Sequence, residues 1–252
     1  MTATEPLLRV EGLTKRFGGL IATDGIHLDI LPGEVHALIG PNGAGKSTFI
    51  GQLSGEIRPD GGRILLGSRD ITRLPPHRRS HMGLARSFQI TSVFPEFSVL
   101  DNVTLAIQAH AGHSFRFWKD AGLDAELSRP AAAILGDQQL DSRRAALAST
   151  LSHGERRQLE LAIALASRPK LLLLDEPAAG MGPEESQRLI ERLKTLRGHL
   201  GILLVEHDME TVFALADRIT VLESGRVLAS GDPAAIRNNP DVRAAYLGDD
   251  DA

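Results

Sequence analysis

The stretch "LIGPNGAGKSTFIGQL", residues Leu38–Leu53, determines how the rest of the chain is interpreted. It starts in an apolar run typical of a buried strand and returns to an apolar pattern typical of a helix. Three glycines, a proline and an asparagine separate the two, and a lysine and two hydroxyl residues follow. Glycine allows backbone conformations that other residues rarely adopt, so the loop can turn successive amide groups toward one centre.

This loop fits the pattern G-x-x-x-x-G-K-[ST] of a phosphate-binding P-loop, with the strand before it and the helix after it that the pattern requires. Its amide groups and the positive end of the helix dipole would form a cradle for phosphate oxygens. The lysine is predicted to reach the β- and γ-phosphates of ATP, and the first hydroxyl to coordinate Mg²⁺. The predicted nucleotide contacts are Gly40, Asn42, Gly43, Gly45, Lys46, Ser47 and Thr48.

A second motif stands at the end of the apolar run "LLLLDEP". Asp175 closes a strand that is apolar throughout, as expected in a parallel sheet covered on both faces, and is predicted to hold Mg²⁺. A carboxylate beside bound phosphate is unfavourable unless it takes part in the chemistry, so Glu176 is predicted to activate or orient water. The alternative, two acids that only end a strand or cap a helix, is less favoured beside a P-loop.

The composition limits the classes of protein to consider. A chain of 252 residues, 42% of them hydrophobic, is long enough for one large α/β domain or one domain with an insertion. The net charge of -4 argues against a nucleic-acid-binding protein, and the absence of cysteine excludes disulfides and thiolate chemistry. The N-terminus lacks a secretion signal, and no apolar run approaches the ~20 residues of a membrane helix. We expect a soluble, cytoplasmic protein that reaches a membrane by docking.

The alternation of apolar strands and amphipathic helices predicts a parallel or mixed sheet. Strands are expected in "LLRVEGL", "IHLDILPGEVHALIG", "GGRILLG", "KLLLLD", "GILLVE", "RITVLE" and "RVLASG". A helix is expected between Pro183 and Gly198, where leucine and isoleucine recur at helical spacing. Residues of about 87–168 are interpreted as a mostly helical insertion, in which Ser98 caps a helix with Asp101 at its third position.

The segment "LSHGERRQLELAIALASRPKLLLLDEP", Leu151–Pro177, resembles the ABC-transporter ATPase family, whose L-S-G-G-Q signature precedes the Asp-Glu motif by a similar distance. Further motifs follow in the family's order over nearly the whole chain. The resemblance implies an adenine-stacking aromatic, a Q-loop glutamine that serves catalysis and the metal, two nucleotide-binding signature residues, and a catalytic switch histidine. These positions are Phe17, Gln89, Ser152, Gly154 and His207.

The resemblance also implies an architecture and an assembly. We expect an α/β protein: a P-loop NTPase core with a mixed, largely parallel sheet, an antiparallel β subdomain and an inserted α-helical subdomain. A single ABC ATPase domain would span 1–252, with the core and β subdomain in about 1–86 and 169–252 and the helical subdomain in about 87–168. One P-loop and one signature in each chain imply that two subunits, as a homo- or heterodimer, enclose two ATP molecules.

Partners and location follow from the same resemblance. Membrane permease subunits would bind the ATPase at the cytoplasmic face of the inner membrane, and a periplasmic solute-binding protein would act indirectly, without nucleic acid. The stretches "GLARSFQITSVFPEFSVLDNVTLA", "EPAAGMGPEE" and "AAYLGDD" look like the ATPases of branched-chain amino acid importers and their urea and amide relatives. A lipopolysaccharide-export ATPase and a non-transport ABC ATPase are the alternatives, whereas the signature argues against a small-molecule kinase.

The chain departs from the family pattern in two places. The signature reads "LSHGE", so His153 and Glu155 replace the more usual glycine and glutamine. Ser152 is still a good helix N-cap, and Glu155 stands where a capping box places its acid. Gly182 occupies the position where many relatives carry the D-loop aspartate, which puts that acid's contact between subunits in doubt.

An apolar loop follows the Q-loop position. In "ITSVFPEFSVLDN", Val93, Phe94 and Phe97 lie close together, and Pro95 stiffens the backbone. Such side chains can pack into their own domain, or they can line a groove that receives a short cytoplasmic helix of a permease. The sequence leaves both interpretations open.

Overall fold

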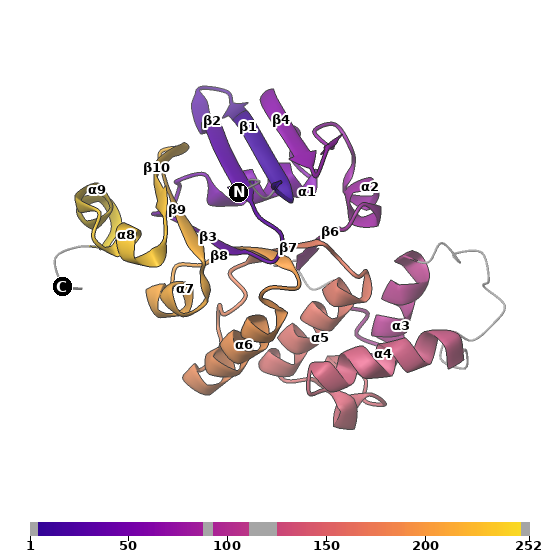
Figure 1. The fold of residues 1–252 in the computed structure, drawn as a ribbon. Coiled ribbons are helices and arrows are strands. Elements are labelled where there is room, and N and C mark those ends of the chain that lie inside the picture. Colours follow the sequence, from indigo (N-terminus) through magenta and orange to yellow (C-terminus); the bar gives the residue numbers. More distant parts are fainter. Residues whose placement is uncertain (1–4, 88–92, 111–124, 248–252) are drawn as a thin grey trace.

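The computed structural model describes residues 5–87, 93–110 and 125–247. Two β-sheets lie one above the other in Figure 1, with α1 between them and the remaining long helices below the larger sheet. The expected mixed α/β architecture is therefore present, and the order of its elements places the P-loop between the two sheets.

The smaller sheet is antiparallel and has the strand order β2-β1-β4-β5. Its strands alternate between buried and more exposed positions, because one face packs on the core and the other meets solvent. The strands are β1 (Leu8–Phe17), β2 (Leu20–Ile30), β4 (Gly61–Leu66) and β5 (Arg69–Asp70).

The larger sheet has the order β10-β9-β3-β8-β7-β6 and is parallel except for the β9–β10 pair. Its central strands β3, β7 and β8 are buried at every position, as expected where both faces are covered. The strands are β3 (Val35–Ile39), β6 (Leu84–Ser87), β7 (Leu171–Asp175), β8 (Gly201–Val205), β9 (Arg218–Glu223) and β10 (Arg226–Gly231).

Strand β7 shows how the two faces are covered. Leu171 and Leu173 pack with α1 (Lys46–Ser54) and the smaller sheet, whereas Leu172 and Leu174 pack with α5 (His153–Ala166) and α6 (Pro183–Leu196). The alternation follows from the two-residue period of a strand. The other helices are α2 (Pro76–His81), α7 (Met209–Leu215), α8 (Pro233–Arg237) and α9 (Pro240–Val242).

A separate cluster of buried apolar side chains holds α3 (Val99–His110), α4 (Ala125–Asp137) and the outer face of α5 together. The expected cap of α3 is confirmed, because the Ser98 hydroxyl accepts a hydrogen bond from the Asp101 amide at 3.0 Å and donates one to the Asp101 carboxylate at 2.6 Å. Short helical turns at Asp141–Arg143, Ala148–Thr150 and Arg243–Leu247 complete the described chain.

Strand β6 was missed by the sequence analysis, which began the helical insertion near its end. It has four residues and finishes with arginine and serine, too short and too polar for a recognisable strand pattern. The division near residues 87 and 168 remains our interpretation of the domain. Among the helices of the described ranges, none combines the length and the hydropathy needed to cross a bilayer.

Candidate functional site

The P-loop joins the end of β3 to the start of α1 and needs glycine at two points. Gly40 has φ of 146° and Gly45 has φ of 103°, both in the region that side chains disfavour. A Cβ at Gly40 would lie 2.1 Å from the carbonyl oxygen of Leu222, and one at Gly45 would lie 2.2 Å from that of Ala22. The loop is thus folded tightly against neighbouring backbone, and its conformation depends on these two residues.

Lys46 is the first residue of α1 and is mostly buried. Its ammonium group donates hydrogen bonds to the carbonyls of Gly40 and Pro41, at 2.6 and 3.0 Å. Burial lowers the pKa of Lys46, and the nearby carboxylates of Glu176 and Asp175 act in the opposite direction. The lysine and both acids of the second motif therefore share one electrostatic environment. Asn42, Gly43 and Ser47 are exposed and Thr48 is half-buried.

Asp175 ends β7 and is only 5% exposed. Burial raises the pKa of its carboxyl group, and the guanidinium of Arg86 opposes that shift. Nη2 of Arg86 donates to Oδ2 of Asp175 at 3.0 Å, and Nη1 of the same side chain lies 2.6 Å from Oε2 of Glu56. Arg86 was not among the predicted site residues, yet it is the hydrogen-bonded charge partner of the predicted metal ligand.

Glu176 and His207 follow the ends of the adjacent strands β7 and β8. Glu176 has φ of 48°, an unusual backbone conformation for a residue with a side chain, and its amide donates to the Val205 carbonyl at 2.8 Å. Oε1 of Glu176 lies 3.7 Å from Nδ1 of His207, which is 63% exposed. The structure therefore brings together the predicted general base and the predicted switch histidine.

Glu206 is a third acid at this sheet edge, and the sequence analysis missed it. It is 1% exposed, and its carboxylate accepts hydrogen bonds from the amides of Ala178 and His207, at 2.9 and 3.2 Å. Burial raises its pKa. The parallel register pairs Asp175 with Val205, so Glu206 stands beside Glu176. The pattern of two neighbouring apolar strands that both end in acids could have revealed it.

The signature residues lie at the start of α5, away from the P-loop of the same chain. Ser152 and Glu155 form the expected capping box, with the Glu155 amide donating to the serine hydroxyl and the Ser152 amide donating to the carboxylate. A Cβ at Gly154 would lie 2.3 Å from the carboxylate of Glu185 on α6, so a larger residue there would have to displace that side chain. The pocket that Ser152 and Gly154 line contains none of the P-loop residues.

Both departures from the family pattern lie near this helix start. Nε2 of His153 is 3.5 Å from the carbonyl oxygen of Ala179, in the loop that follows Glu176. Gly182 is the N-cap of α6, and its amide donates to the Glu185 carboxylate at 3.4 Å. His153 therefore contacts the loop that carries the D-loop position within its own chain.

Two further predicted residues have different outcomes. Phe17 ends β1 and is 49% exposed, with Nζ of Lys15 5.3 Å from the centre of its ring. It is open to a stacking partner, and its role stays a prediction. Gln89 lies outside the described residues.

Comparison with known proteins identifies the family. A family model described as ABC transporter matches residues 23–179, and one described as branched-chain amino acid ATP-binding cassette transporter matches residues 226–252. The chain belongs to the ABC transporter family of ATP-binding cassettes. The resemblance inferred from the sequence motifs is confirmed, and with it the expectation of an ATPase.

Curated relatives extend the match over the full chain. The chain is 42% identical to the high-affinity branched-chain amino acid transport ATP-binding protein LivG of Escherichia coli (strain K12), over 98% of this chain and 99% of that protein. It is 39% identical to BraF of Pseudomonas aeruginosa, with the same coverage. A probable LivG of Archaeoglobus fulgidus is 36% identical over 98% of this chain and 97% of that protein.

Solved structures confirm the fold. A nucleotide-free ATP-binding cassette from an ABC transporter superposes with a TM-score of 0.84 at 29% identity, covering 96% of this chain and 99% of the other. The ADP conformation of an ABC transporter cassette gives a TM-score of 0.85 at 30% identity with the same coverage. The expected P-loop core with mixed sheets is thus the fold of this family.

Proposed function

We propose that this chain is the ATP-hydrolysing subunit of an importer for branched-chain amino acids or a related small solute such as urea or an amide. The observation that carries the proposal is full-length similarity to LivG and BraF, whose names give branched-chain amino acid transport. The separate match of residues 226–252 to a branched-chain amino acid cassette model supports it. These relatives favour import over the alternatives of lipopolysaccharide export and non-transport activity.

The residues around Asp175 fit a magnesium ion. Mg²⁺ prefers hard oxygen ligands and keeps several waters, so one carboxylate and one hydroxyl suffice beside nucleotide phosphates. Asp175 supplies a buried carboxylate that a cation already neutralises in this structure, and Ser47 supplies an exposed hydroxyl next to Lys46. Bound Mg²⁺ would reduce the negative charge of the phosphates, and Gln89 is proposed as a further ligand.

Four residues of the chain are proposed to bind ATP or to take part in its hydrolysis. Lys46 would exchange its two carbonyl partners for phosphate oxygens, since an ammonium group gains more from a charged acceptor. The Glu176 carboxylate would accept a proton from the attacking water, and His207 beside it would contact the γ-phosphate. Phe17 would stack on the adenine.

A second subunit would complete the site, because the pocket lined by Ser152 and Gly154 in the described part of the chain contains no P-loop residue. The N-terminus of α5 presents backbone amides and the positive end of a helix dipole, which favour an anion. Ser152 and Gly154 of one subunit would therefore meet the γ-phosphate held by the other subunit's P-loop.

Substitution of Glu176 tests this function. We expect Glu176→Gln to bind ATP but to hydrolyse it at least ~100-fold more slowly, because an amide cannot accept the proton from water. The variant should then accumulate as an ATP-bound dimer in size-exclusion chromatography. Lys46→Ala is the control, which should neither bind ATP tightly nor dimerise. Turnover near that of the wild type in Glu176→Gln would contradict the assignment.

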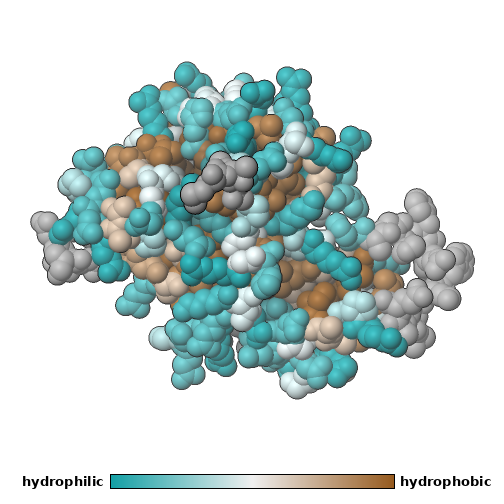
Figure 2. Space-filling view, viewed as in Figure 1, coloured by the Kyte–Doolittle hydropathy of each residue, from teal (hydrophilic) through white to brown (hydrophobic). Residues whose placement is uncertain are grey.

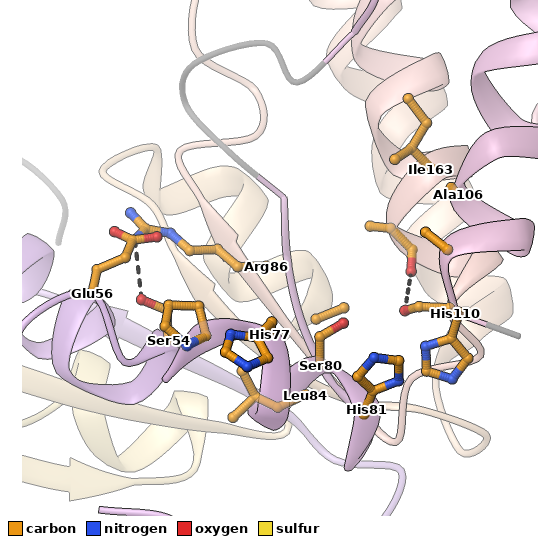
Figure 3. A pocket seen from close by; sticks show the side chains of 15 residues that line it. Ser54, Glu56, His77, Ser80, His81, Leu84, Arg86, Ala106, His110 and Ile163 are labelled. Atoms are coloured by element: carbon orange, nitrogen blue, oxygen red, sulfur yellow. Dashed lines mark hydrogen bonds and ion pairs between the residues drawn. The ribbon is translucent and has the colours of Figure 1, made fainter. Parts of the chain in front are cut away.

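A pocket of about 360 Å³ between the core and the helices supports docking of a permease segment. It lies between α2, the end of α1, β6, α3 and α5 (Figure 3). In the space-filling view, hydrophobic residues reach the surface near α5 and α3 (Figure 2). A short apolar helix from a permease would fit such a groove.

The loop before α3 adds an aromatic surface. Phe94 is 56% exposed and Phe97 is 45% exposed, and their ring centres are 5.4 Å apart. The buried side chain of Asn102 fixes this loop, because it accepts from the Phe94 amide at 2.8 Å and donates to the Phe94 carbonyl at 3.1 Å. Val93, by contrast, packs against the helical core. The two phenylalanines are thus held outward, as an interface anchor would be.

We expect Phe94→Ala to weaken binding of the permease by roughly tenfold or more, as loss of an aromatic anchor does. The measurement is co-purification of the membrane subunits together with solute uptake, while ATP affinity of the free subunit should be unchanged. Leu20→Ala, which removes an exposed side chain from β2, is the matched control. Normal assembly and uptake in Phe94→Ala would remove this loop from the permease interface.

Docking onto a permease would place the chain at the cytoplasmic face of the inner membrane, with a periplasmic solute-binding protein acting through the permease.

A further inference from the structure

Arg86 contacts Asp175, the aspartate proposed to bind Mg²⁺, and also lines the pocket between the core and the helices. It lies on β6 opposite Leu173 of β7, so Asp175, two residues farther on, is on the same side of the sheet. Its side chain is 13% exposed and contacts Asp175 through Nη2 and Glu56 through Nη1. Nη1 also lies 3.4 Å from the hydroxyl of Ser54 at the end of α1.

The two carboxylates that share Arg86 differ in their environment. Asp175 is almost fully buried, whereas the side chain of Glu56 is 40% exposed. Figure 3 shows Arg86 and Glu56 together at one end of the pocket, with His81 of α2 and His110 of α3 toward the other end. One guanidinium therefore neutralises the buried acid on one side and forms part of the pocket wall on the other.

Mg²⁺ and Arg86 would compete for the same acid. Arg86 donates a hydrogen bond to Oδ2 of Asp175, and the same carboxylate is proposed to bind the metal. Two cations held within a few ångströms of each other repel strongly in a site of low polarity. Glu56 offers Arg86 a second anion at 2.6 Å, so the guanidinium can leave Asp175 without becoming an unpaired buried charge.

We propose that Arg86 is a positioning residue that serves as an internal counter-cation for Asp175, which Mg²⁺-nucleotide displaces toward Glu56 and the pocket wall. This inference rests on the proposed metal site at Asp175. When Arg86 moves, the wall of the pocket proposed to receive the permease changes with it, so the shape of this pocket depends on whether Mg²⁺ is bound.

The test is a titration of the purified chain with Mg²⁺ in the presence of a saturating fluorescent ADP analogue. The fluorescence of the analogue is followed, and the Mg²⁺ concentration that gives half of the fluorescence change is the quantity compared. In Arg86→Gln the competitor is absent, so the Mg²⁺ concentration at half-saturation should fall about tenfold, the lower end of what a charge at this distance does to a neighbouring group. In Glu56→Gln, Arg86 loses its alternative partner and stays with Asp175, so the half-saturation concentration should rise. Arg86→Lys, which cannot bridge both acids, should lie between Arg86→Gln and the wild type.

Controls separate the outcomes. Arg63→Gln breaks an exposed ion pair with Glu11 in the smaller sheet and should leave the titration unchanged. If Arg86→Gln does not fold, Glu56→Gln decides, because its side chain is partly exposed. Opposite shifts in the two variants support the proposal, and unchanged or equal shifts overturn it. Wild-type magnesium dependence in Asp175→Asn would instead contradict the proposed metal site itself.

Discussion

At the scale of single residues, Glu206 shows how a buried acid can hold the backbone of a site through hydrogen bonds. Its carboxylate accepts hydrogen bonds from the amides of Ala178 and His207. It therefore fixes the loops that follow β7 and β8, next to Glu176. Two part-buried amides would lose their acceptor if the carboxylate were removed, at a cost of about 1 kcal/mol each, the lower end of the penalty for an unpaired buried group. The position of Glu176, the proposed general base, thus depends on a neighbouring buried acid.

We expect Glu206→Ala to reduce kcat by about tenfold or more while nucleotide affinity changes little, because Lys46 and the P-loop are not altered. Glu206→Gln keeps one acceptor and should lose less activity than Glu206→Ala. Steady-state ATP hydrolysis and equilibrium binding of a fluorescent nucleotide provide the two measurements. Equal losses of kcat and of nucleotide affinity would indicate general unfolding of the sheet edge instead.

At the scale of elements, helix α1 depends on a buried arginine from α2. Arg79 is 1% exposed, and its guanidinium donates to the carbonyls of Gln52 and Leu53, both at 2.7 Å, and to those of Leu74 and Thr72. Burial lowers its pKa to about 10, so it remains charged at neutral pH. The last carbonyls of a helix favour a cation, and α1 therefore carries Lys46 at one end and is capped by Arg79 at the other.

We expect Arg79→Leu to lower the free energy of unfolding by about 3 kcal/mol or more, because four carbonyls, two of them buried, lose their donor together. Arg78→Leu, at the exposed neighbouring position, is the matched control and should change stability by less than about 0.5 kcal/mol. Urea denaturation of both variants measures the difference. Similar stabilities of the two variants would show that Arg79 does not hold the helix end.

The elements also show what the sequence could and could not predict. The P-loop, the capping box of α5 and the bounds of α6 are local patterns, and each is present where it was expected. The roles of Arg79, Arg86 and Glu206 arise from side chains that meet across neighbouring elements, and no local spacing encodes such contacts. Exposure of Phe94 was likewise undecided, because an apolar loop pattern is compatible with either face.

At the scale of the whole molecule, a polar network joins the two sheets near His36 of β3. Arg218 of β9 donates to the Asp29 carbonyl of β2 at 2.6 Å and to the Glu34 carboxylate at 2.7 and 3.0 Å. His36 is 1% exposed, with Nε2 2.8 Å from the hydroxyl of Thr220 and Nδ1 3.5 Å from Glu34. The smaller sheet therefore contacts the larger one through a charged network, in which Arg218 is 33% exposed and a neutral histidine is buried.

Burial, and then the nearby Arg218, lower the pKa of His36 from 6.5 to about 3. Between these values the unfolded chain binds a proton that the folded chain does not, so the stability that His36 permits at neutral pH is lost as the pH falls below 6.5. The loss is about 1.4 kcal/mol for each pH unit, or about 2 kcal/mol between pH 6.5 and pH 5.

Urea denaturation over this range should therefore show a smaller loss of stability in His36→Gln, which can still form a hydrogen bond to Thr220, than in the wild type. His27→Gln, at an exposed histidine of β2, should follow the wild type. Parallel curves for wild type and His36→Gln would mean that the acid sensitivity of the fold lies elsewhere than between the sheets.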